Sequence, residues 1–385
     1  MRPAAARRGL TLVELVVAAG LLSILMVVLF GLLDSFLSMW ERSEQRRQLA
    51  EGSLGIVDLL AEDFAALEGG TRGDLLCEWV AFDVDGDGSP ETKWPRLRLV
   101  RRASQARLAQ LQAHAADREA GEGLLEVCWA LLPARTLGPR PVAGSASAAA
   151  AGDAAARRDG LAEGFLWRGE RLYGSRDATH PSFFSTAFVS GTGRPQPGAL
   201  DEVSGGVLWL GMQFATESSS LHDDWRTGSD PADVVASWDA WNRGRPDADA
   251  HWWNEPAAGM PAAGDRPRLP RRVRFELELE RPGDLKRRTR LERLVDARAS
   301  TLAVLDDERL PGVGPAAAAE REAPRYVCVD AEWMRVLAVS AGAVQVQRGA
   351  RGTTPRAHEA GALVHYGTTL VREVPIALHR EDWTP

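Results

Sequence analysis

The sequence has only three cysteines among its 385 residues: Cys77, Cys128 and Cys328. So few thiols, so widely spaced, exclude a disulfide-rich scaffold and a zinc site built from CxxC pairs. Because the count is odd, at least one thiol stays free if the other two pair. Cys77 and Cys128 fall in predicted strands of one domain and would form a bridge if that domain lies outside the cytoplasm. The alternative is three buried thiols that pack as small hydrophobic groups.

Catalytic and phosphate-binding motifs are equally scarce. No stretch contains a Gly-x-Ser-x-Gly elbow, a phosphate loop, a dinucleotide-binding fingerprint or a His-Glu-x-x-His pair. The seven histidines and the 53 acidic residues show no grouping typical of a metal or acid–base site. A hydrolase would have to use Asp247, Asp249 and Glu255, whose spacing fits no such signature. We therefore expect no catalytic residues and no enzyme.

The chain also lacks a sustained basic run. Lys and Arg number 46 against 53 Asp and Glu, which gives a formal charge of −7. The densest arginine cluster, at positions 266, 268, 271, 272 and 274, is interrupted by prolines and is typical of a solvated approach to a strand. A net acidic chain without a basic patch is a poor candidate for nucleic-acid binding, so we expect no nucleic-acid partner.

What the sequence does contain is a long apolar run near its start. From Leu15 to Leu33 only Ser23 carries a polar side chain. At about 1.5 Å per residue, a helix over residues 10–33 covers a hydrocarbon core of roughly 30 Å. Arginines 2, 7 and 8 hold the leader, residues 1–9, on the cytoplasmic side by the positive-inside rule. The pattern predicts a single-pass membrane protein with its head on the far side of the membrane from the cytoplasm.

One carboxylate, Glu14, lies just inside this run. A carboxylate in a spanning helix costs on the order of a few kcal/mol unless it is paired, so it indicates a functional contact. A plain signal anchor would leave Glu14 unexplained.

The border residues Gly9-Leu10-Thr11-Leu12-Val13-Glu14 resemble the class III signal of type IV prepilins and type II secretion pseudopilins. The family usually has Phe where this chain has Leu10. The resemblance implies that a prepilin peptidase cuts after Gly9 and methylates the new amino terminus of Leu10. It also implies that Glu14 neutralises the amine of a neighbouring subunit during assembly, with Thr11 and Leu12 in the same assembly segment.

The helix is expected to continue to residue 70, because the first proline after Leu33 is Pro90. Apolar residues then recur at helical spacing, which predicts an amphipathic second half that packs on a sheet; they are Ile56, Leu59, Leu60, Phe64 and Leu67. The pair Gly69-Gly70 is expected to end the helix. The expected fold class is α+β: a long pilin helix on an antiparallel β-sheet head, with a small all-β C-terminal module.

The head is expected over residues 71–304. Strands are predicted at 75–84, 93–101, 123–132, 206–216, 272–280 and within 291–304, a hairpin at 165–173, and a helical segment at 103–120. Inserted loops are expected at 143–160 and 217–270. The second contains a Trp-rich segment, 225–261, which serves either as a glycan or protein contact surface or as its own small core.

A linker rich in Pro, Gly and Ala is expected at 305–325, followed by a β-module at 326–376. Its segment Arg348 to Thr354, with His358 and Gly361, is similar to small β-modules of phage structural proteins. In this reading His358 is a turn residue rather than a catalyst.

One turn of the head could bind calcium. Its acidic residues at spacing two resemble the start of a calcium loop, with a fourth ligand further on: Asp83, Asp85, Asp87 and Glu91. Trp94 stands where an EF-hand has its bidentate acid, and Asp-Gly repeats also make ordinary hairpin turns. We favour the hairpin turn and therefore expect no cofactor, with calcium as the alternative.

These features together favour a minor pseudopilin of type II secretion, most similar to the J-type. Its expected partners are a prepilin peptidase, other minor and major pseudopilins and an inner-membrane assembly platform. The alternatives are a minor pilin of a type IV pilus and a membrane-anchored module that binds a surface or a substrate.

Overall fold

A computed structural model describes residues 12–82, 92–114, 122–133, 164–176, 181–185, 200–215, 234–235, 237–241, 252–253, 267–280, 289–306, 310, 325–340 and 342–376. The chain divides into two compact units, Met1–Leu54 and Gly55–Pro385. The first unit contains most of the long N-terminal helix, and the second contains the end of that helix and the strands of the described residues. We describe each unit by itself.

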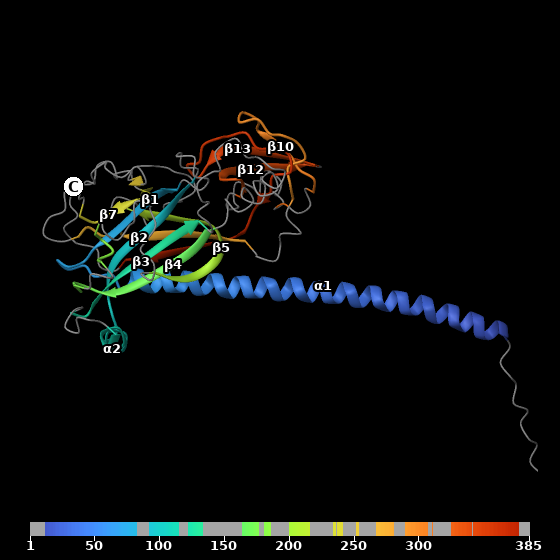
Figure 1. Ribbon diagram of the computed structural model, residues 1–385, viewed down its shortest axis with the longest axis horizontal. Helices are drawn as coiled ribbons and strands as arrows, with labels where there is room; N and C mark the ends of the chain where they lie inside the picture. Colours follow the sequence, from blue (N-terminus) through green and yellow to red (C-terminus); the bar gives the residue numbers. More distant parts are fainter. Residues whose placement is uncertain are drawn as a thin grey trace, which may run out of the picture. The chain divides into compact units, whose positions relative to one another are not determined.

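The N-terminal helix α1 runs from Leu12 to Ala65 (Figure 1). In the first unit, its stretch from Ala19 to Leu37 is long and apolar enough to cross a membrane, and none of it is buried. The hydroxyl of Ser23 donates a 2.9 Å hydrogen bond to the carbonyl oxygen of Ala19. The single polar side chain of the apolar run is therefore satisfied within the helix, as a hydrocarbon environment requires.

The end of α1 has the expected amphipathic character. Ile56, Val57, Leu60 and Phe64 are buried, whereas Asp58 and Glu62 on other faces are exposed. The ring of Phe64 stacks on that of Phe275 with centroids 5.8 Å apart. This apolar face covers one side of the large sheet.

The helix ends at Ala65 rather than at the predicted residue 70. Beyond Ala65 the backbone bonds to the sheet instead: the amide of Glu68 donates to the carbonyl of Val100, and the amide of Arg102 donates to the carbonyl of Ala66. The bridge between Leu67 and Arg101 belongs to the same pairing. Since each amide makes one such bond, pairing with the strand replaces the last helical turn.

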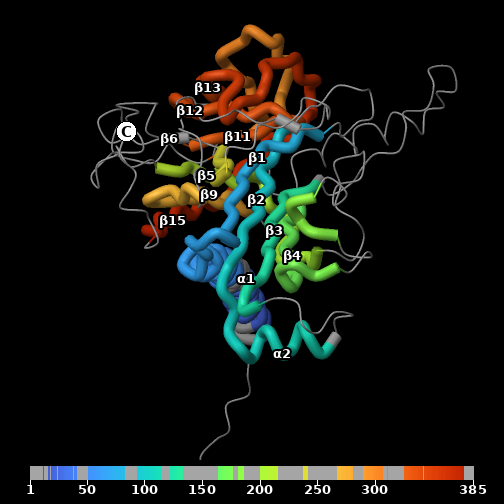
Figure 2. The backbone as a smooth tube through the Cα atoms, turned by 90° about the vertical axis from the view of Figure 1, so that its left-hand side faces the viewer, coloured from blue at the N-terminus to red at the C-terminus, as the bar shows by residue number. Residues whose placement is uncertain are grey.

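Within the described residues, the large sheet has ten antiparallel strands, of which eight follow the order β15-β9-β5-β4-β3-β2-β1-β7. Figure 2 shows β1, β2, β3 and β4 side by side. The long strands are β1 (Leu75–Phe82), β2 (Thr92–Arg102), β3 (Leu124–Pro133), β4 (Gly164–Leu172), β5 (Asp201–Ala215), β9 (Arg272–Leu279) and β15 (Thr368–Pro375). The short strands are β6 (Val234–Val235) on β5, and β7 (Trp238–Asp239) and β8 (Trp252–Trp253) on β1. One N-terminal helix and large antiparallel sheets fit the expected α+β class.

The second sheet has, in the part of the chain that the structure describes, five strands in the order β10-β13-β12-β11-β14. They are β10 (Thr301–Ala303), β11 (Tyr326–Val329), β12 (Glu332–Ser340), β13 (Ala343–Ala350) and β14 (Val364–His365). Its core contains aliphatic residues from every strand, among them Leu302, Val327, Met334, Val346 and Val364.

The division of the strands between the two sheets does not follow the linker expected at residues 305–325. Strand β10 precedes the predicted linker yet pairs with β13, through Leu302 opposite Val344. Strand β15 lies within the predicted module yet pairs with β9, from Thr368 opposite Leu279 to Pro375 opposite Arg272. A Pro- and Gly-rich composition marks a connection but carries no information on strand partners, so the boundary of the small module could not be placed from it.

Two smaller expectations also change. The predicted hairpin at 165–173 is one strand, β4, because its residues pair with β3 without interruption from Leu172 opposite Leu125 to Gly164 opposite Pro133. The helical segment expected at 103–120 is α2 (Gln105–His114), with residues 115–121 outside the described part.

The three cysteines are unpaired and buried. The thiol of Cys77 lies 3.7 Å from the sulfur of Met212, and Cys128 packs with Phe183 and Leu200. The structure therefore agrees with the prediction of three buried thiols and not with a bridge between Cys77 and Cys128.

Candidate functional site

The residues that the sequence singles out lie mostly where the structure gives no detail. Gly9, Leu10 and Thr11 lie outside the described residues, as do Asp83, Asp85, Asp87 and Glu91 of the acidic turn. Leu12 opens α1 with its side chain exposed. Glu14 lies in the first turn of α1, but its side chain is outside the description. Among the described residues, no group of three His, Cys, Asp or Glu could hold a metal ion.

A buried carboxylate that the sequence did not indicate joins the end of α1 to the sheet. Asp63 Oδ2 accepts hydrogen bonds from the indole Nε1 of Trp129 at 2.7 Å and from Nε of Arg168 at 3.0 Å. Its Oδ1 accepts from Nη2 of Arg168 at 2.8 Å and lies 3.2 Å from Nε of Arg101. Strands β2, β3 and β4 thus converge on one helical side chain.

The same cluster extends through Glu170 on β4. Glu170 accepts from Arg101 at 2.7 Å, from Arg168 at 2.5 Å and from Arg107 of α2 at 2.6 Å. Burial alone would raise the pKa of Glu170, but the three arginines outweigh it and lower this pKa to about 2. The carboxylates of this cluster hold α1 and α2 on the sheet by charge-assisted hydrogen bonds.

A second buried charge lies between the two sheets. Arg351, in the turn after β13, has a backbone φ of 52° and donates to Glu278 at 2.7 Å and to Glu276. Its guanidinium carbon lies 4.1 Å from the ring centroid of Tyr326, 4.2 Å from that of Trp333 and 4.7 Å from that of Trp209. Burial raises the pKa of Glu278, against the opposing effect of Arg351. This arginine joins the five-stranded sheet to β5 and β9.

Beside Arg351 lies a cavity of about 300 Å³. Aromatic rings from three strands line it, together with charged side chains from β2 and β9: Trp79, Trp209, Tyr326, Lys93, Arg274 and Glu276. The rings of Trp79 and Trp209 are 5.4 Å apart and tilted by 32°. A Cβ on Gly211 would meet Nε1 of Trp209 at 2.6 Å, so the indole lies directly over this glycine. The cavity combines apolar walls with a few charged groups, as ligand sites do.

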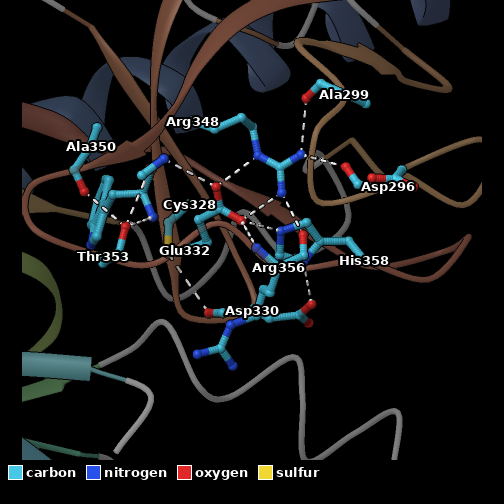
Figure 3. A network of polar contacts seen from close by, with 12 residues as sticks. Asp296, Ala299, Cys328, Asp330, Glu332, Arg348, Ala350, Thr353, Arg356 and His358 are labelled. Atoms are coloured by element: carbon cyan, nitrogen blue, oxygen red, sulfur yellow. Dashed lines mark hydrogen bonds and ion pairs between the residues drawn. The ribbon is translucent and has the colours of Figure 1, made fainter.

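The expected turn residue His358 is instead buried in a polar network (Figure 3). Its Nδ1 lies 2.7 Å from Asp330 Oδ2 and its Nε2 lies 2.9 Å from Glu332 Oε2. Glu332 also accepts from Arg348 at 2.7 Å through both oxygens, and from the backbone amides of Gly349 and Arg356. Glu332 is fully buried, and its contacts indicate that the network stabilises the five-stranded sheet.

The pKa values of this network follow from its contacts. Burial would lower the pKa of His358, but the hydrogen bonds to Asp330 and Glu332 raise it above the usual value. Burial would raise the pKa of Glu332, but Arg348, His358 and the amide of Arg356 lower it to about 2. His358 therefore favours the protonated form and Glu332 the ionised form.

The Trp-rich segment is described only in part. Trp238 is buried against Phe214, with centroids 5.8 Å apart, and its indole donates to the carbonyl of Arg268. The indole of Trp241 donates to the carbonyl of Gly73. These two tryptophans belong to the head rather than to an outer contact surface. Asp247, Asp249 and Glu255 lie outside the described residues.

Comparison with known proteins finds no match among protein-family models, curated proteins or solved structures.

Proposed function

We propose that this protein is a minor pseudopilin, anchored in the inner membrane by α1 and assembled into the tip of a type II secretion pseudopilus. Its amino terminus would face the cytoplasm and its head the periplasm. Its partners would be a prepilin peptidase, other minor and major pseudopilins and the inner-membrane assembly platform.

The observation that carries the proposal is the change of character along one helix. Between Ala19 and Leu37, α1 is exposed and mostly apolar, with Asp34 near the end of the stretch, which suits lipid or the apolar helices of neighbouring subunits. In its last turns, from Ile56 to Phe64, it buries an apolar stripe against an antiparallel sheet. A subunit of a helical filament needs both: one part to pack in the membrane and in the filament core, another to hold the head rigidly.

The second support is the sequence at the border of the apolar run. Gly9 precedes the run, whereas an ordinary secretory signal has its cleavage site after it. Glu14 provides a carboxylate for the new amine of a neighbouring subunit. The same features suit a minor pilin of a type IV pilus, which is the first alternative. Co-purification with the other pseudopilins of a type II secretion system, or with the pilins of a pilus, separates the two systems.

Cleavage is the direct test. We expect co-expression with a prepilin peptidase to shorten the chain after Gly9 and to add one methyl group at Leu10, measured by intact mass. Gly9→Leu should abolish cleavage because the bulky side chain blocks the scissile bond. Gly20→Leu makes the same change inside the apolar run, where a Cβ meets nothing within 4 Å, and should be cut normally. A wild-type chain that stays uncut, or is cut after the apolar run, would contradict the proposal.

A further inference from the structure

We propose that the outer edge of β15 is a docking site for an extended segment of a different protein chain, which adds to the large sheet as one more antiparallel strand. The site is separate from the assembly segment at the amino terminus and from the cavity beside Arg351. If the chain assembles as proposed above, a neighbouring pseudopilin supplies the segment, and only this choice of partner rests on the proposed function.

Strand β15 is long compared with the other strands at the ends of the two sheets. Within the described residues, the large sheet ends on one side at β15, which has eight residues, and on the other at β7 and β8, which have two each. The five-stranded sheet ends at β10 and β14, which have three and two. Very short edge strands keep an edge from pairing with another chain. Of the edges that the structure describes, β15 is the one long enough to take up a further strand.

The backbone of β15 directs a row of hydrogen-bonding groups away from its partner strand. The amide of Ile376 donates to the carbonyl of Arg271, which continues the β15–β9 register. Because this antiparallel register is continuous and its hydrogen bonds alternate, the amides of Thr369, Val371 and Glu373 point away from β9. No strand of the described residues lies on that side. These amides and the carbonyls of the same residues can therefore bind a second extended backbone.

The side chains of β15 favour an apolar partner over a charged one. Arg372 pairs with Asp58 on α1. The carboxylate of Glu373 lies 3.8 Å from the guanidinium of Arg272. Val371 lies between these charges in the strand and is 42% exposed, so an apolar side chain opposite it would bury both. The partner is therefore recognised by its backbone and by an apolar residue opposite Val371, and not by its charge.

The direction of α1 excludes a second copy of this chain as the occupant. Two copies that pair antiparallel through β15 are related by a two-fold axis perpendicular to the joint sheet. Since the last turns of α1 pack on the face of this sheet, the rotation reverses them, and the two helices then point in opposite directions. Copies anchored in one membrane need these turns to point the same way. A different chain is not bound by this symmetry.

A suitable probe is the octapeptide with the sequence of β9, Arg-Val-Arg-Phe-Glu-Leu-Glu-Leu, acetylated and amidated at its ends. Strand β9 already matches β15 residue by residue on the inner edge, and the side chains of β15 present the same two faces to a strand on its outer edge. We expect saturable binding to the full-length, uncleaved chain in detergent micelles, measured by calorimetric titration with empty micelles as the blank. The absence of saturable binding would overturn the proposal.

Two N-methylated peptides show whether the backbone carries the binding. In the expected register, the peptide residues that correspond to Arg274, Glu276 and Glu278 direct their amides toward β15, and the residues between and before them direct theirs away. Methylation of these three amides should weaken binding at least about tenfold. Three methyl groups on the alternate amides should leave it unchanged. Equal binding of the two methylated peptides would show recognition by side chains alone and would rule out strand addition.

A variant of β15 places the binding at this edge. Val371→Pro removes one outward N–H and keeps the amides that bond to β9, so the head should stay folded by near-ultraviolet circular dichroism. It should weaken peptide binding at least about tenfold, whereas Val371→Thr keeps the N–H and the β-branched shape and should bind normally. Equal binding by wild type and Val371→Pro would place the peptide elsewhere and contradict the proposal.

Sedimentation of the chain without peptide tests the other occupant. We expect one chain per micelle at the concentrations of the titration. A dimer that Val371→Pro abolishes would make a second copy the occupant and overturn the assignment to a different chain. Because the chain is uncleaved, failure of peptidase processing leaves all of these results unaffected.

Discussion

The indole of Trp129 on β3 donates a 2.7 Å hydrogen bond to the carboxylate of Asp63 on α1, and both side chains are buried. The same carboxylate receives the fork of Arg168. A helix that packs on a sheet by apolar contacts alone can slide by a turn, whereas a shared buried charge fixes its register. This contact therefore fixes where the last turns of α1 lie on the head.

Asp63→Asn should destabilise the head by roughly 3 kcal/mol, because it removes one of the two carboxylates that pair with Arg168 and Arg101 and leaves both arginines with Glu170. Glu62→Gln is the matched control. The Glu62 side chain is 68% exposed and has a 3.5 Å contact with Arg101, so we expect this variant to lose less than about 0.5 kcal/mol of stability. Urea unfolding of the full-length chain in micelles measures both. Similar losses for the two variants would show that Asp63 does not act as the buried anchor.

Glu14→Ala should leave cleavage after Gly9 intact and abolish co-purification with partner pilins. An unpaired amine in the apolar core of a filament costs on the order of a few kcal/mol, and Glu14 is the carboxylate available to pair it. Asp34→Ala removes the carboxylate at the other end of the apolar run and should assemble normally. Retention of partners by Glu14→Ala would remove the assembly role.

Arg351→Lys should destabilise the chain by about 2 kcal/mol although the charge is kept, since lysine cannot reach Glu276 and Glu278 with a planar fork or stack between three rings. Arg335→Lys, on the exposed face of β12, should change stability by less than about 0.5 kcal/mol. Near-ultraviolet circular dichroism also reports on the environment of Trp209 and Trp333. An unchanged spectrum and unfolding midpoint for Arg351→Lys would contradict the role of this side chain.

His358 predicts a pH dependence with a defined sign. Its pKa is raised in the folded protein, so the stability that it contributes is fully present below the ordinary histidine pKa of about 6.5 and is lost as pH rises through the folded value. Glu332 acts at the other end, because its lowered pKa contributes stability that is present above about 4.5 and is lost as pH falls toward about 2.

We therefore expect His358→Gln to cost about 2 kcal/mol near pH 5.5 and clearly less near pH 9. Urea midpoints across this range, compared with the wild type at each pH, give the difference. A cost that is constant with pH would mean that His358 is neutral in the folded state.

The cysteines should be inert in the native protein. Burial raises the pKa of Cys128 to about 12 and raises those of Cys77 and Cys328 as well, so thiolate is scarce at pH 8. Ellman's reagent should detect no rapidly reacting thiol in the folded chain and three after denaturation without reductant. Fewer than three after denaturation would indicate a disulfide.

Local patterns were enough to predict several of the regular elements. The apolar run gives the first part of α1, the spacing of Ile56, Leu60 and Phe64 gives its buried face, and strict alternation gives β9. These features depend on residues that are close in the sequence, so the spacing of the apolar residues shows whether they form a helix or a strand.

Contacts between distant residues could not be predicted in the same way. Asp63 is 66 positions from Trp129, and nothing near it in the sequence distinguishes it from the exposed Glu62. Arg351 and Glu278 are 73 positions apart. His358 follows a turn-rich stretch, and only the return of Asp330 and Glu332 beside it makes it a buried charge. Pairing across sheets is decided by topology, which the sequence of a single chain does not display.

The position of β15 has a consequence for the order of folding. Strand β15 pairs with β9, although β10 to β14 lie between them in the chain, so the five-stranded sheet is an insertion into the large one. One edge of β9 stays unpaired until the inserted segment has folded and β15, which begins at Thr368, pairs with it. Such non-local closure is slow, and it exposes a template for wrong pairing meanwhile. Rapid formation of the inserted sheet would then limit misfolding of the whole head.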